Sequence, residues 1–197
     1  MHLSIVRKLA LVLFSAAVFS APVRAQDWSV GASIGLTNDV NHRVRVSGFD
    51  PSDANAWVDF QLEERTLLRG TIGSIKTKGS NAGLLADIDG EEIELPDLKA
   101  RIDYVNVGVS YQFWEGDYTS GIFGGIGGYK IDPERVAPEF EGFEDPKETV
   151  FGLHVGIDGD LRVISRLSLV GRITLHKIFS ERNRLLLTAS AGLGFRF

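Results

Sequence analysis

The strongest constraint on this chain is a period-two alternation of apolar residues with polar or small ones, which recurs along most of its length. It is clearest at the C-terminus, where every second residue from Leu185 to Phe197 is apolar and Thr, Ser, Gly and Arg predominate between them. A period of two is that of a β-strand with two unlike faces, whereas helical periodicity is weak throughout. The alternation therefore predicts an all-β protein.

Eight segments carry this alternation, and several are longer than the roughly five or six residues usual in soluble sheets. They are residues 27–36, 56–63, 66–77, 101–113, 118–130, 148–158, 166–177 and 184–197. Short connectors (64–65, 114–117 and 159–165) alternate with long polar ones (37–55, 78–100 and 131–147), and 178–183 joins the last two segments. Short turns at one end and long loops at the other are typical of outer-membrane barrels. The sequence thus predicts an eight-stranded antiparallel transmembrane up-and-down β-barrel with both termini at the short-turn end.

The one long apolar run lies at the N-terminus and has the layout of a secretory signal peptide. Basic Arg7 and Lys8 precede the apolar residues 9–19, and Val23 and Ala25 are the small residues expected before a cleavage site. We therefore expect residues 1–25 to be a signal peptide and residues 26–197 to be the barrel domain; a short N-terminal membrane anchor is the alternative. Cleavage removes three of the 21 basic residues and none of the 26 acidic ones, so the net charge changes from −5 to −8.

Composition excludes several classes of function. The chain has no Cys, which excludes disulfide scaffolds, Cys-rich zinc sites and thiol catalysis. Its negative charge argues against nucleic-acid binding, which depends on neutralising phosphates. The four His residues show no paired spacing of a zinc site, so we expect neither a metal nor a cofactor. Residues 86–93 predict a hairpin that turns at Asp89-Gly90, with an acidic cation-binding patch as the alternative.

The first predicted hairpin specifies its own register. A tight turn at residues 64–65 pairs Leu62 with Thr66, Phe60 with Leu68 and Val58 with Gly70 on the lipid face. The same register sets Asp59 opposite Arg69 on the lumen face, where the two can form an ion pair. A slip by one residue would move Arg69 into lipid at a cost of about 2–4 kcal/mol near the bilayer midplane.

Charged and ionisable side chains of the lumen face form the candidate site, which we interpret as a self-neutralising polar network. Its members are Asp59, Arg69, His154, Asp158, Arg172, His176 and Arg196. A narrow gated path for a small solute is the alternative. A hydrolase built from Ser168 or Ser190 with a histidine is less favoured, because pairing Leu175 with Leu187 separates Ser190 from His176.

Aromatic residues cluster near predicted strand ends, as the girdles of a membrane barrel require. Those expected at the short-turn end are Trp28, Phe113, Trp114, Tyr118, Phe195 and Phe197, and those expected at the long-loop end are Tyr129, Phe151 and Phe179. The alternation places Trp57 on the lumen face, so this residue fits the girdle arrangement less well. The glycines of residues 121–128 lie on both faces and leave the orientation of Phe123 and Tyr129 open.

The ending Leu-Gly-Phe-Arg-Phe, with Phe195 and the terminal Phe197, resembles the strand by which the barrel assembly machinery recognises outer-membrane proteins. The whole predicted barrel is similar to small barrels of the OmpA/OmpX/OmpW type. The resemblance implies residence in a Gram-negative outer membrane, with outer-membrane lipid and lipopolysaccharide as partners. We expect a monomer without enzymatic activity, acting in envelope structure or through its loops. Alternatives are solute passage as in OmpW-like barrels, a lipid-modifying hydrolase, and a soluble secreted ligand-binding barrel.

Overall fold

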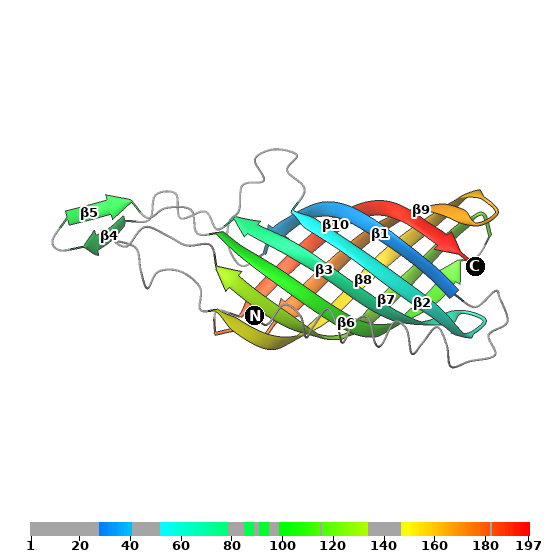
Figure 1. The fold of residues 1–197 in the computed structure, drawn as a ribbon, viewed down its shortest axis with the longest axis horizontal. Helices are drawn as coiled ribbons and strands as arrows, with labels where there is room; N and C mark the ends of the chain where they lie inside the picture. Colours follow the sequence, from blue (N-terminus) through cyan, green and yellow to red (C-terminus); the bar gives the residue numbers. More distant parts are fainter. Residues whose placement is uncertain are drawn as a thin grey trace, which may run out of the picture.

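A computed structural model of the chain describes residues 28–40, 52–78, 85–88, 91–94, 99–114, 116–133, 147–181 and 183–197. Eight strands close into an antiparallel barrel in the order β1-β10-β9-β8-β7-β6-β3-β2, and β4 pairs separately with β5 (Figure 1). The barrel strands are β1 (Trp28–Asp39), β2 (Asp53–Glu63), β3 (Thr66–Lys78), β6 (Lys99–Trp114), β7 (Tyr118–Pro133), β8 (Glu148–Ile164), β9 (Leu167–Ile178) and β10 (Arg184–Arg196). The predicted fold class is therefore confirmed.

Several sequence predictions fall wholly or mainly outside the described residues. The expected signal peptide lies there, as do most residues of the three long connectors. The second connector contains the hairpin predicted around Asp89-Gly90, formed by β4 (Leu85–Ile88) and β5 (Glu91–Glu94) with Ile88 paired to Glu91. No helix in the described parts of the chain is long and apolar enough to cross a membrane.

The register agrees with the sequence prediction except at two short turns. Asp59 lies opposite Arg69, and Ser190 lies opposite Arg172, both as predicted. The predicted pairing of Leu62 with Thr66 is wrong, because a bulge between Gln61 and Glu63 pairs Glu63 with Thr66.

Strand β8 also runs further than predicted. Residues 159–164, expected to form a turn, continue the strand. Leu161 is paired with β7 on one side and with β9 on the other, so both of its edges are hydrogen-bonded. The alternation of apolar and polar residues continues as far as Val163, and a bulge between Arg162 and Ile164 precedes the turn at residues 165–166.

The outward face of the barrel is apolar and open to its surroundings. Aliphatic side chains such as Ile122, Val107 and Ile157 are about half exposed, and similar residues occur around the wall. Phe113, Tyr118 and Phe197 are exposed at the short-turn end, while Phe151 and Phe179 stack with ring centroids 6.0 Å apart at the long-loop end. A continuous apolar belt bounded by aromatic rings matches the hydrocarbon core of a bilayer.

The interior is divided into two layers along the barrel axis. The half nearer the long loops, here called the apolar layer, is packed with buried side chains. They are Ile75, Ala100, Ile102, Tyr104, Tyr129, Ile131, Ile178 and Leu186. The half nearer the short turns, here called the charged layer, holds Asp59, Arg69, Asp158 and Arg172. Tyr129, expected in a membrane girdle, is instead fully buried inside the barrel.

Lumen-facing aromatic rings lie over glycines of neighbouring strands. A Cβ added at Gly31 would lie 2.2 Å from the Trp57 ring, and one at Gly156 would lie 2.5 Å from the Phe123 ring. Gly73 and Gly152 accommodate Tyr104 and Tyr129 in the same way. The absence of a Cβ lets each ring lie flat against the wall, which allows a narrow barrel to enclose four large side chains. This arrangement determines the orientation of Phe123 and Tyr129, which the sequence left open.

Candidate functional site in the barrel interior

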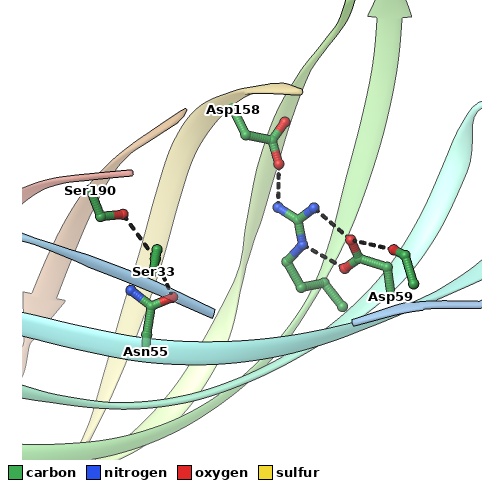
Figure 2. Close-up of polar contacts among 7 residues, drawn as sticks. Ser33, Asn55, Asp59, Asp158 and Ser190 are labelled. Atoms are coloured by element: carbon green, nitrogen blue, oxygen red, sulfur yellow. Dashed lines mark hydrogen bonds and ion pairs between the residues drawn. The ribbon is translucent and has the colours of Figure 1, made fainter. Parts of the chain in front are cut away.

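Arg69 is the centre of the charged layer. Its Nε donates to Asp59 Oδ1 at 2.6 Å and its Nη2 donates to Asp59 Oδ2 at 2.9 Å, so the two side chains form a bidentate pair between β2 and β3. Its Nη1 reaches across the lumen to Asp158 on β8; Figure 2 shows the guanidinium between the two labelled carboxylates. One buried guanidinium thus binds two buried carboxylates, and the Asp59–Arg69 ion pair predicted from the sequence is confirmed.

A second polar chain connects β1, β2 and β10. Ser33 Oγ lies 2.9 Å from Asn55 Oδ1 and 3.3 Å from Ser190 Oγ, as seen in Figure 2. Asn55 in turn donates to Asp53, which also accepts a hydrogen bond from the Tyr104 hydroxyl at 3.4 Å. Sequence reasoning missed Asp53 because it was assigned to a long connector. Extending the alternation of β2 back by two residues from Asn55 would have placed Asp53 on the lumen face.

Arg172 differs from Arg69 in how it is held. It is 7% exposed, its guanidinium carbon lies 4.1 Å from the centroid of the Trp57 ring, and it lies 5.5 Å from that of Phe123. Among the described residues, neither its Nε nor its Nη2 has a hydrogen-bond partner. Arg172 is therefore stabilised by cation–π contact while one edge of its guanidinium has no protein acceptor.

His154 and His176 lie deeper, against the apolar layer. His176 Nδ1 lies 3.1 Å from the Tyr129 hydroxyl oxygen, and its Nε2 lies 3.5 Å from Thr188 Oγ1. The ring centroids of His154 and His176 are 6.4 Å apart. No group of three potential metal ligands occurs in the part of the chain that the structure describes. These histidines act there as packed polar rings.

The two serines of the hydrolase alternative have other partners. Ser168 donates to Asp160 at 3.0 Å, and Ser190 lies against Ser33. Neither serine is hydrogen-bonded to a histidine within the described residues, so the nucleophile–base contact of a serine hydrolase is not formed there.

The charged layer opens toward the short turns. A cavity of about 610 Å³ at this end, here called the vestibule, is lined by Trp57, Arg69, Asp158, Arg172 and other residues. Arg196, which we expected to join the lumen network, also lines it but is exposed. It occupies the last position of β10, opposite Ser29 near the start of β1, at the open short-turn end of the barrel. Arg196 therefore belongs to the mouth of the vestibule, while the other six predicted residues lie inside.

Solved structures of bacterial outer-membrane proteins have the same fold. A major outer membrane protein from Thermus thermophilus matches with a TM-score of 0.58 and 13% identity, over 88% of this chain and 100% of that one. OprG from Pseudomonas aeruginosa matches with a TM-score of 0.56 and 10% identity, over 88% and 96% of the two chains. Ail from Yersinia pestis, solved with the heparin analogue sucrose octasulfate, matches with a TM-score of 0.52 and 11% identity, over 87% and 97%.

No protein-family model matches the sequence, and no curated protein matches it. The structural likeness therefore concerns the fold: this chain is folded as a small transmembrane β-barrel of the outer-membrane type.

Proposed function

We propose that this protein is a non-catalytic outer-membrane barrel that does not conduct solutes and that contacts the envelope through its outer surface and loops. The observation that carries the proposal is the apolar layer across the lumen. The side chains of Ile75, Ile102, Tyr129, Ile178 and Leu186 are less than 2% exposed, and they come from five different strands. An eight-stranded barrel is just wide enough for its own side chains to fill it.

A packed apolar layer opposes solute passage for a physical reason. An ion or polar solute crossing it would lose its water without gaining polar partners, and hydrophobic constrictions in channels close by this means. The charged layer does not provide a bypass, because it lies in series with the apolar layer along the same axis. This argues against the alternative of solute passage through the lumen.

Contact with the outer leaflet is supported by a basic patch on the outside of β3, β6 and β7. We call it the rim patch; it consists of Lys76, Lys99, Arg101 and Lys130 on these strands and of Lys147 directly before β8. Lys76 is directly opposite Arg101, and Arg101 is directly opposite Asp132, so the patch crosses adjacent strands at the long-loop end. It lies beyond the apolar belt on that side, at the level of lipid headgroups.

The rim patch retains positive charge after its internal ion pairs are counted. Asp103 pairs with Arg101 at 2.8 Å, and Asp132 pairs with Lys147 at 2.9 Å and with Lys130 at 3.7 Å. Among the described residues of this rim, two acids thus form ion pairs within a patch of five bases. We infer that the phosphates of lipopolysaccharide bind here, which suits flexible exposed Lys and Arg side chains.

The C-terminal strand bears on the other proposed partner, the barrel assembly machinery. Phe195 and Phe197 lie with their ring centroids 5.2 Å apart, and Phe197 is 53% exposed directly after β10, at the short-turn end. We propose that these two rings are the signal read by the barrel assembly machinery. Once assembled, β10 pairs with β1 and the barrel is closed, which is compatible with a monomer.

Fractionation and conductance test the proposed function together. We expect the protein in the outer-membrane fraction, with a mobility on detergent gels that changes on boiling. Purified protein in planar bilayers should give no discrete current steps. Regular single-channel steps would overturn the sealed lumen, and a freely soluble mature protein would overturn the membrane barrel.

Co-purification with lipopolysaccharide tests the rim patch. Replacing Lys76 and Arg101 by Gln should lower the amount of lipopolysaccharide retained by several-fold. The matched control replaces Arg162 and Arg166, exposed at the opposite end, by Gln and should leave retention unchanged. Equal losses in both variants would show that overall charge, and not the patch, retains the lipid.

A further inference from the structure

The lipid-facing wall of the barrel has a long depression, here called the trough, with a volume of about 1160 Å³. Its floor is a row of small residues on four adjacent strands: Ser120 on β7, Gly159 on β8, Gly171 on β9 and Ala191 on β10. Each of them is the register partner of the next, so the row is continuous. A Cβ added at Gly171 would meet nothing within 4 Å, which shows that the floor is open there.

Large aliphatic side chains form a ridge along each side of the trough. On the side nearer the long loops, Ile157 is paired with Ile173. On the side nearer the short turns, Leu161, Leu169 and Leu193 are paired in turn. All five side chains are about half exposed on the outside of the barrel. The trough is therefore open along its length to the lipid that surrounds the wall, and a lipid chain reaches its floor directly.

The two ends of the trough lie at different depths in the membrane. Phe113 and Tyr118 stand at one end, among the exposed aromatic rings of the short-turn end. Ile34 stands at the other end, in the middle of β1, where it is paired with Ala191 and 62% exposed. The trough crosses five strands about 4.8 Å apart and is thus about 19 Å long. An acyl chain spans about 15 Å, half the thickness of the hydrocarbon core, so its length fits the trough.

The Tyr118 side chain supplies a polar group at the shallow end. A Cβ added at Gly159 would lie 2.9 Å from the Tyr118 hydroxyl oxygen, so the ring leans over the floor of the trough. Among the described residues this hydroxyl has no hydrogen-bond partner. Aromatic rings of a membrane girdle lie at the level where headgroups join their acyl chains. The hydroxyl can therefore donate to an ester carbonyl oxygen of a lipid whose chain lies on the floor.

We propose that the trough binds one acyl chain of a phospholipid from the leaflet facing the periplasm, with the ester carbonyl at Tyr118. The occupant is a lipid chain because the trough is continuous with the apolar belt and begins at the headgroup level of the short-turn end, which faces the periplasm. All lipid tails are equally apolar, so packing distinguishes one position on the wall from another. A chain in the trough contacts the floor and both ridges, whereas a flat wall contacts it from one side.

Photo-cross-linking locates the chain. The full-length mature protein is reconstituted in phosphatidylethanolamine vesicles that contain a trace of the same lipid with a diazirine midway along one acyl chain. After irradiation, mass spectrometry identifies the labelled residues. We expect Ile173 and Leu169 to be labelled about threefold or more above Val107 and Val109, which are equally exposed on β6 outside the trough, because the trough offers a chain more contacts.

Gly171→Leu is the test variant, since its side chain would fill the open floor. We expect labelling of Ile173 and Leu169 to fall by about threefold or more, because the added side chain displaces the lipid chain from its contacts. Gly128→Leu is the matched control: an added Cβ at this lipid-facing glycine also meets nothing within 4 Å, and it lies outside the trough. Its labelling pattern should equal that of wild type. Tyr118→Phe should lower labelling by about twofold, as befits one exposed hydrogen bond.

Three outcomes would overturn the site. Even labelling around the whole belt would show that lipid contacts the wall without a preferred position. Unchanged labelling in Gly171→Leu would show that the chain does not lie on the floor. Cross-links between two copies of the protein that disappear in Gly171→Leu would make a second copy, and not a lipid, the occupant. Heat-modifiable mobility establishes that each variant is folded, and if Gly171→Leu does not fold, the wild-type pattern decides.

This inference rests on the proposed membrane placement of the barrel, and the experiment separates the two. Retention of lipopolysaccharide should be the same in Gly171→Leu and in wild type, because the rim patch lies at the opposite end of the barrel. A failure of the trough therefore leaves the rim patch intact, whereas a freely soluble mature protein would remove the basis of both.

Discussion

The two layers of the barrel interior are filled by opposite means, although most of the outer wall around them is apolar. In the charged layer a few directional contacts, led by Arg69 with Asp59 and Asp158, neutralise buried charge and leave a vestibule of about 610 Å³. In the apolar layer side chains such as Ile102 and Leu186 pack until they are fully buried. Charged groups need partners at specific distances and angles, so they leave space between them. Apolar side chains have no such requirement and pack until the space is filled. One layer therefore leaves a cavity inside the barrel, and the other closes the lumen.

Removing the central cation should produce the largest effect and test the charged layer directly. Arg69→Ala leaves Asp59 and Asp158 buried and unpaired, which we expect to cost about 3–5 kcal/mol of unfolding free energy. Urea unfolding in micelles measures it. Adding Asp59→Asn and Asp158→Asn to the same variant should recover much of the loss. A cost below about 1 kcal/mol would mean that the layer is well hydrated.

Truncation in the apolar layer comes next in size. Leu186→Ala removes a fully buried side chain and should cost about 2–4 kcal/mol, because a cavity forms among packed neighbours. Leu187→Ala, one residue along and facing lipid, is the matched control and should cost less, since lipid chains fill the space. Similar losses for both would contradict a packed seal, and the same urea titration decides.

The ring-over-glycine arrangement gives an intermediate effect. Gly156→Ala would place a methyl group 2.5 Å from the Phe123 ring and 2.3 Å from the Ile173 carbonyl oxygen, so we expect a loss of about 1–3 kcal/mol. At Gly171, on the lipid face of β9, an added Cβ meets nothing within 4 Å. Gly171→Ala should therefore change stability by less than about 0.5 kcal/mol. Equal effects would show that the rings move aside freely.

The smallest expected effect lies outside both layers, in the rim patch. Lys147 donates to Asp132 and, with Lys130, holds the pKa of that exposed carboxyl below its usual value. Lys147→Ala should raise the pKa of Asp132 toward normal, which a carboxyl NMR titration detects. A lowered folded-state pKa stabilises the protein above the unfolded pKa, and that contribution disappears as the pH falls through the folded value. Because the group is exposed, we expect no measurable change in unfolding free energy.

Much of the fold could be predicted because its determinants are local. Alternation along each segment indicated all eight barrel strands, and the Asp59–Arg69 pair followed from a turn only two residues long. The pairing of Leu62 with Thr66 failed where a bulge interrupts the pattern, and the glycines around Phe123 left its orientation open. The end of β8 and Asp53 were missed although the alternation reaches them, because both were assigned to connectors. A bulge shifts the strand register without changing the composition. A glycine has no side chain whose polarity would indicate which face of the strand it lies on.

The alternating sequence by itself determined that the chain forms a barrel with an apolar outer face, because the bilayer imposes the same requirement on every strand. Only the tertiary structure decided how the lumen is divided. Arg69 meets Asp158 across strands β6 and β7, and Arg172 is placed on Trp57 from the opposite wall. These contacts join residues far apart in sequence, and closure of the barrel brings them within hydrogen-bonding and stacking distance. The alternation along each strand indicates which residues face inward. Closure of the barrel decides which of these side chains come into contact.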